Sequence, residues 1–152
     1  MLGTLARWLR LLGYDTRFDP GLDDHALVRL ARAEGRILLT RDRALAARRG
    51  LQSLFVQEED LEAQIVQVVR ALGLPSGLEP RCAVCNGELA FVPKAAVQSL
   101  VPPYVFHTQS EFRRCMACGR VYWRGTHWPH IAAKLAQWQA ADVPDDAGGS
   151  QE

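Results

Sequence analysis

The chain has 152 residues, 48% of them hydrophobic and 23% charged, which is enough for one ordinary domain with or without a small appended module. This composition is typical of a globular protein, and no apolar run approaches the roughly 20 residues of a transmembrane helix, so we expect no membrane association. Arg7 and Arg10 interrupt the apolar N-terminal stretch, and no small-residue cleavage site follows it. We therefore expect a cytoplasmic protein without a secretory signal.

The net charge of +1 is unevenly distributed, and 16 of the 18 basic residues are arginines. Residues 1–50 and 81–131 each carry +4, whereas residues 51–80 carry −4 and residues 132–152 carry −3. Because the planar guanidinium group suits phosphate, the two basic blocks favour a nucleic-acid partner. The alternative is that a GC-rich gene encodes arginine in place of lysine.

The first half of the chain alternates predicted helices with short strands. Helical spacing of apolar residues, glycine stops and the Pro20–Gly21 turn predict a helix at 4–12, a short strand at 14–19, a helix at 24–34, a strand at 36–40, a helix at 42–49, a strand at 51–56 and a helix at 58–72. This alternation predicts an α/β layer with a parallel sheet, although the chain opens on a helix where such folds offer a strand.

All four cysteines lie in the second half, in two C-x-x-C pairs that are each followed closely by glycine: Cys82 with Cys85, and Cys115 with Cys118. A tight turn aims two thiolates at one tetrahedral ion, and glycine permits the positive φ that the turn needs, so the pairs predict a structural zinc site. Disulfides are disfavoured in a cytoplasmic chain, and a thioredoxin-like redox pair would leave the other pair unexplained. Four thiolates fill the coordination shell, so we expect the metal to stabilise the module without taking part in catalysis.

The cysteine module has the features of a zinc ribbon with an insertion. Strand-like segments at 88–92 and 120–124 would supply its hairpins, and residues 94–110 indicate an inserted helix and loop. Residues 73–77 read as a linker before it, and the acidic, Gly/Pro-rich residues 142–152 read as a disordered tail.

Aromatic residues and arginines are interleaved in this module, so it is a candidate RNA-binding surface. Arg113 and Arg124 can hold phosphates while neighbouring rings stack on single-stranded bases. The alternative is that the rings form the small core and the arginines its solvated rim. His127 is a candidate for RNA contact or proton transfer, against the interpretation of a hydrogen-bonded structural histidine.

Acidic residues follow the predicted strands and turn. Asp42 comes directly after the strand at 36–40, Asp23 and Asp24 open the helix at 24–34, and an acidic run at 58–60 follows the strand at 51–56. Ligands gather beyond the carboxyl ends of parallel strands, and clustered carboxylates there suit Mg²⁺ or Mn²⁺ for phosphodiester cleavage. The alternative for each acid, taken singly, is helix capping.

The sequence resembles the Mut-seven C-terminal RNase family over roughly residues 1–130. The segments that carry the resemblance are MLGTLARWLRLLGYDT, LDDHALVRLARAEGRILLTRDRAL, VPPYVF, CGRVYWRGTHW and the two C-x-x-C turns, which we call the first knuckle (residues 82–85) and the second knuckle (residues 115–118). It implies a PIN-like, three-layer parallel-sheet nuclease domain at 1–78, a zinc ribbon at 79–131, and a short helix with a disordered acidic tail at 132–152. It also implies a metal-dependent ribonuclease, a hydrolase in which Asp24, Asp42 and the adjacent Asp23 are catalytic.

In that interpretation, Asp24 and Asp42 bind catalytic Mg²⁺ or Mn²⁺, and zinc is structural. Glu59 or Asp60 is a loose candidate for a further acidic position, and Arg41 or Arg43 would contact a phosphate of the RNA. PIN-like domains begin with an apolar strand ending in Asp, which this sequence lacks. We expect that the protein starts upstream of Met1, since the chain without that strand would lose one metal-binding carboxylate and be inactive.

Two other functions stay open from the sequence. The zinc ribbon could bind RNA without catalysis, with the α/β half as scaffold, or the chain could dock a protein partner. The RNA substrate, the mode of cleavage and the oligomeric state are left open.

Overall fold

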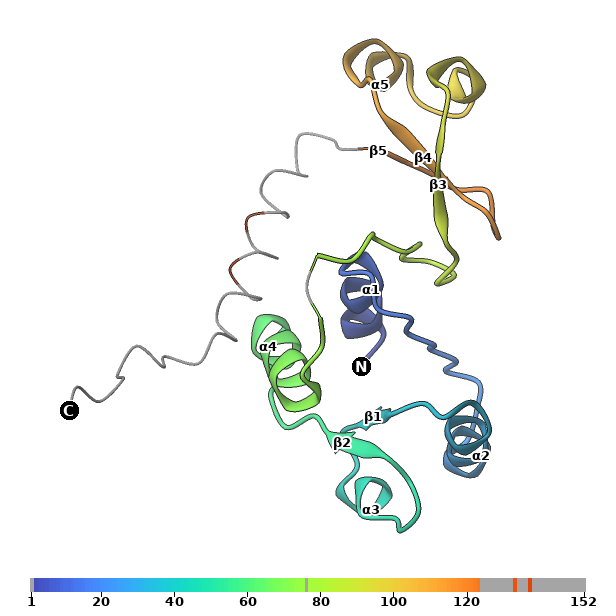
Figure 1. Cartoon of the computed structure of the whole chain (residues 1–152). Helices are drawn as coiled ribbons and strands as arrows, with labels where there is room; N and C mark the ends of the chain where they lie inside the picture. The colour runs from blue at the N-terminus through green and yellow to red at the C-terminus, as the bar shows by residue number, and fades with distance from the viewer. Residues whose placement is uncertain (1, 76, 124–132, 134–136, 138–152) are drawn as a thin grey trace, which may run out of the picture.

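The computed structural model describes residues 2–75, 77–123, 133 and 137 (Figure 1). The first half contains six elements in chain order: α1 (Gly3–Leu11), α2 (Asp24–Glu34), β1 (Leu38–Thr40), α3 (Arg43–Ala46), β2 (Ser53–Phe55) and α4 (Leu61–Leu72). β1 and β2 pair in parallel, with Leu39 opposite Leu54. The parallel α/β arrangement that the sequence predicts is thus present, as a sheet of two strands in the described chain.

The second half forms a separate antiparallel sheet in the order β3-β4-β5 (Figure 1). Its elements are β3 (Leu89–Val92), the 3-10 helix η1 (Lys94–Val97), α5 (Pro103–Thr108), β4 (Phe112–Cys115) and β5 (Val121–Trp123). The expected insertion between the strands is therefore a 3-10 helix and a short α-helix.

Aspartates begin three of the helices in the first half. The side chains of Asp23, Asp42 and Asp60 accept hydrogen bonds from backbone N–H groups in the first turns of α2, α3 and α4. These bonds satisfy donors that a helix leaves unpaired at its N-terminus. At the other end, Gly35 and Gly73 take left-handed φ values of 63° and 57° and close α2 and α4.

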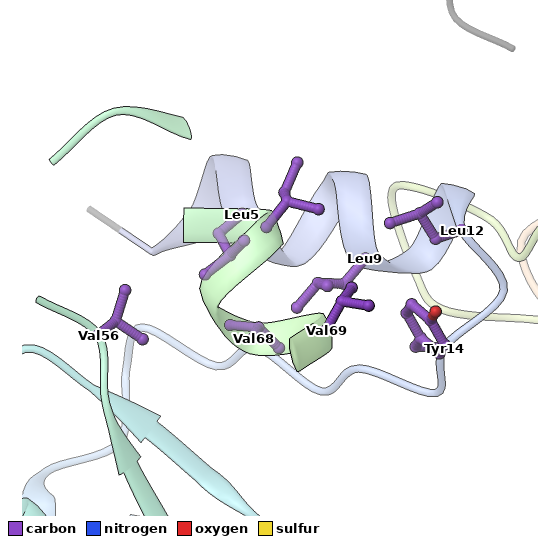
Figure 2. Close-up of a cluster of buried hydrophobic side chains, with 8 residues drawn as sticks. Leu5, Leu9, Leu12, Tyr14, Val56, Val68 and Val69 are labelled. Atoms are coloured by element: carbon purple, nitrogen blue, oxygen red, sulfur yellow. The ribbon is translucent and has the colours of Figure 1, made fainter. Parts of the chain in front are cut away.

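The larger core lies where α1 packs against α4 and the end of β2. Leu5 and Leu9 on one face of α1 lie beside Val68 and Val69 of α4, and Val56 closes the cluster from the strand side (Figure 2). Burial of such side chains stabilises the fold by about 1.5–3 kcal/mol each. A second, smaller core holds the inserted helices against β4, and its members are Val97, Val101, Val105 and Phe112.

One expectation about secondary structure is wrong, and one strand was missed. Residues 14–19 form no strand, because the backbone N–H of Thr16 donates to the Asn86 side chain in the cysteine module. The central strand β4 was not predicted, since its sequence FRRC does not alternate; pairing with strands on both sides stabilises it.

The other predicted elements differ from the structure only in their length, or they fall on residues that the structure does not describe. The helix expected at 42–49 is limited to Arg43–Ala46. None of the helices in the described part of the chain has the length and apolar character needed to cross a bilayer. Arg124, His127 and nearly all of 132–152 lie outside the described residues.

Candidate metal centre and carboxylate-rimmed groove

The four cysteines meet at one point between the two knuckle turns. Their Sγ atoms all lie within 4.8 Å of one another, with Cys82 and Cys118 at 3.7 Å and Cys85 and Cys115 at 3.4 Å. A tetrahedral zinc with Zn–S bonds of about 2.3 Å separates its sulfur ligands by about 3.8 Å. The cysteines are free thiols at nearly this spacing, so the cluster fits one zinc ion and could hold it.

Both knuckles place a left-handed residue directly after their second cysteine. Asn86 has φ 70° and Gly119 has φ 80°, and each turn is closed by backbone hydrogen bonds. The sequence interpretation assigned the positive φ to glycine in both turns, whereas in the first knuckle Asn86 adopts it. Gly87 is needed for a different reason, because a Cβ atom there would lie 2.7 Å from Cys115 Sγ.

Hydrogen bonds act in opposite directions on the acidity of Cys115 and Cys85. Although burial acts to raise it, hydrogen bonds from the backbone N–H groups of Cys118 and Ala117 lower the pKa of Cys115 to about 6. The hydrogen bond with Cys115 raises the pKa of Cys85 to about 12. Without metal, the proton thus stays on Cys85, and a divalent ion would displace it.

Tyr122 lies behind the cluster and contacts the first knuckle. Its hydroxyl is 2.8 Å from Cys82 Sγ and accepts a hydrogen bond from the Ala83 N–H at 3.1 Å. Burial, followed by this contact with Cys82, raises the pKa of Tyr122, which keeps the phenol protonated and able to donate to sulfur. Such groups orient metal ligands and tune their charge.

The α/β half contains a second feature, a groove beside β1 that we call the β1 groove. It encloses about 960 Å³. Its walls are mainly apolar and come from four elements: Leu5 and Leu9 of α1, Leu27 and Ala31 of α2, Leu39 of β1, and Val68 and Leu72 of α4. The carboxylates of Asp24 and Asp42 are exposed and also line this groove.

A family model described as the Mut7-C RNAse domain matches residues 1–135. The chain belongs to the Mut7-C RNAse domain family. This confirms the resemblance read from the sequence and points to a ribonuclease-related function with RNA as the substrate class. No curated protein and no solved structure matches the chain.

In this Mut7-C RNAse domain, two of the three predicted catalytic acids, Asp23 and Asp42, are helix N-caps, and the third, Asp24, follows Asp23 directly. Asp42 Oδ1 accepts from the N–H groups of Ala44 and Leu45 at 2.9 and 3.2 Å. Asp23 Oδ1 accepts from Ala26, and Asp24 occupies the first turn of α2. Within residues 2–75 and 77–123, the four cysteines are the one group of three or more potential ligands found close together.

The predicted RNA-binding arginines make contacts within the fold. Arg41 donates to the backbone carbonyl of Glu58 in the loop after β2, and the Arg43 guanidinium lies 4.5 Å from the centre of the Phe55 ring. Arg113 lies 4.4 Å from the centre of the exposed Phe91 ring and forms an ion pair with Glu79 at 2.7 Å. Each of these three arginines therefore already has a partner within the fold.

Sequence reasoning missed the residues that join the two halves. Arg10 donates to the backbone carbonyl of Ala83 in the first knuckle. The Asn86 side chain accepts from the Thr16 N–H and donates to the Asp15 carboxylate at 2.6 Å. The sequence offered one signal for these contacts. Asn86 directly follows the second cysteine of the first knuckle, where it takes the left-handed conformation, and its side-chain amide is then able to contact the α/β half. For Arg10, helical spacing gave no signal, because a cation beside an apolar stripe usually faces solvent.

Proposed function

We propose that this Mut7-C RNAse domain hydrolyses RNA phosphodiester bonds at the carboxylate rim of the β1 groove, with Mg²⁺ or Mn²⁺ as the catalytic ion. The observation that supports it is that Asp24 of α2 and Asp42, which follows β1, line one cavity although different elements carry them. Oxygen ligands from carboxylates are those that both ions prefer.

The capping geometry of Asp42 is compatible with metal binding. Both of its capping bonds go to Oδ1, which fixes the carboxylate and leaves Oδ2 available as a ligand. Thr40 holds the preceding backbone, since its Oγ1 accepts from the Asp42 N–H at 3.0 Å. A divalent ion bound there would lower the pKa of a water molecule and neutralise charge on the scissile phosphate. Asp23 supports the position of Asp24 by capping α2.

A PIN-like architecture further requires an apolar strand in the β1 groove. The N–H of Leu38 and the carbonyl of Thr40 bond toward β2, so the backbone groups of Leu39 between them face the groove. Neither the N–H nor the carbonyl of Leu39 has a hydrogen bond within the part of the chain that the structure describes. An extended segment beside β1 would pair with them and fill the apolar space, and an acid at its carboxyl end would join Asp24 and Asp42.

The zinc ribbon contributes RNA affinity in this proposal. The Phe91 ring is 65% exposed and backed by the Arg113 guanidinium, so it offers a face on which a base can stack. Arg41, Arg43 and Arg124 would add phosphate contacts. If the ribbon alone acted, the protein would be a non-catalytic RNA-binding module, which is the second candidate function.

The test measures cleavage and binding separately with the natural full-length protein. End-labelled single-stranded and hairpin RNAs are incubated with Mn²⁺, and fluorescence anisotropy reports affinity. The variants are Asp24→Asn and Asp42→Asn, and the control is Glu111→Gln. Because Asn is as good an N-cap as Asp, the Asp42 variant keeps its cap. Glu111 is an exposed acid just before β4 that does not line the groove.

Loss of cleavage in the Asp24 and Asp42 variants, with affinity and the control unchanged, supports the nuclease. RNA binding without turnover in the natural protein supports the binding module instead. Cleavage by all three variants at the natural rate would show that the carboxylate assignment is wrong.

A further inference from the structure

Arg10 is a buried cation that has no carboxylate partner among the described residues. Its residue is 7% exposed in the last turn of α1. Its guanidinium donates to three backbone carbonyls: Nε to Thr16 at 2.8 Å, and Nη1 to Ala83 and Val84 at 2.9 and 3.2 Å. Among the ion pairs of the described residues, none involves Arg10. A buried charge without an opposite charge is strongly unfavourable, so an anion is needed nearby.

The cysteine cluster lies next to the Arg10 guanidinium. Ala83 and Val84 are the two residues between the candidate ligands Cys82 and Cys85. Arg10 therefore donates hydrogen bonds directly to the backbone of the first knuckle. Four thiolates around one Zn²⁺ are doubly negative, whereas four neutral thiols would carry no charge.

We propose that Arg10, a residue of the α/β half, is the counter-ion of the zinc tetrathiolate centre and a positioning residue for its first knuckle. The inference rests on zinc occupying the cluster and is independent of the nuclease proposal. It explains why a cation is buried in α1 beside a module that begins some 70 residues later, the sequence separation being 73 between Arg10 and Ala83.

The proposal links metal binding to the α/β half of the protein. The Arg10 carbonyl accepts the Arg81 N–H at 2.8 Å, and Leu9, the preceding residue, belongs to the main core and lines the β1 groove. Loss of zinc leaves the guanidinium without its anion. α1 and the groove wall should then loosen together with the ribbon.

The experiment measures zinc affinity by competition with a chromophoric chelator, after the zinc content of the purified full chain has been determined. Three variants are compared: Arg10→Met removes the charge but keeps much of the length, Arg10→Lys keeps the charge but loses the planar fork, and Arg7→Met is a control on an exposed arginine of the same helix.

We expect Arg10→Met to lower zinc affinity roughly 10- to 100-fold, the range typical of residues that support metal ligands. Arg10→Lys should recover most of that loss, and Arg7→Met should bind zinc as the natural chain does. Hydrogen exchange of the α1 amides should rise on zinc removal in the natural chain.

Two results would overturn the proposal. If Arg10→Lys lost as much affinity as Arg10→Met, the carbonyl hydrogen bonds alone would explain the role of Arg10. If Arg10→Met bound zinc as Arg7→Met does, the charge would have no part in metal binding. A folded natural chain that contains no zinc on purification and shows no measurable zinc affinity would instead refute the zinc assignment on which the inference rests.

Discussion

Replacing Tyr122 by Phe tests whether the phenol supports the metal centre. The change removes one oxygen that lies 2.8 Å from Cys82 Sγ and 3.1 Å from the Ala83 nitrogen, and it leaves the ring in place. A hydrogen bond to a charged group contributes about 1.5–3 kcal/mol. A loss of roughly 10- to 100-fold in metal affinity on removing a supporting group corresponds to about 1.4–2.7 kcal/mol, so the two magnitudes agree.

The assay is a competitive zinc titration at pH 7, with release kinetics as a second measurement. The control is Tyr104→Phe, which makes the same chemical change on a side chain of α5 that is 71% exposed. We expect Tyr122→Phe to lose affinity by the stated factor and Tyr104→Phe to lose none. Equal affinities in the two variants would refute the reasoning, because the sulfur would then not depend on the phenol.

Three further predictions concern packing, backbone space and pH. Ile65→Ala, at a residue with 0% exposure, should destabilise the protein by about 2–5 kcal/mol, seen as a lower urea midpoint with an unchanged slope; a loss below about 1 kcal/mol would contradict the assigned core. Gly87→Ala places a Cβ 2.7 Å from Cys115 Sγ and should weaken zinc binding, whereas Gly21→Ala, with its nearest neighbour at 3.6 Å, should not; equal zinc affinities would contradict the close approach. The hydrogen bond from Asn86, and after it that from Arg36, lowers the pKa of Asp15 in the folded protein. The ionised Asp15 therefore stabilises the fold at pH values above its unfolded pKa of about 3.9, and this stabilisation is lost as the pH falls through the lower pKa of the folded state. Asp15→Asn should therefore lower the melting temperature at pH 7, by an amount that corresponds to about 0–1 kcal/mol for this exposed group. The difference between the variant and the natural chain should shrink as the pH falls below about 3.9, and a difference that grows on acidification would contradict the sign.

The helices and the metal site were predictable from the sequence because local chemistry determines them. Asp23 and Asp60 mark the starts of α2 and α4, and Gly35 and Gly73 mark their ends, through contacts with residues at most a few positions away. The two C-x-x-C pairs likewise specify their own turns. Their meeting at one point could be predicted because a tetrahedral ion needs four ligands.

The tertiary structure alone decided which distant groups lie together. The sequence placed Asp24 at the start of a helix and Asp42 after a strand, and only the packing of α2 beside β1 puts both on one groove. It equally gave no sign that Arg10 faces the first knuckle, since helical periodicity tells which side of α1 is apolar but not what lies against the other side. Contacts between remote segments depend on how the elements pack together, and a local pattern carries no information about that packing.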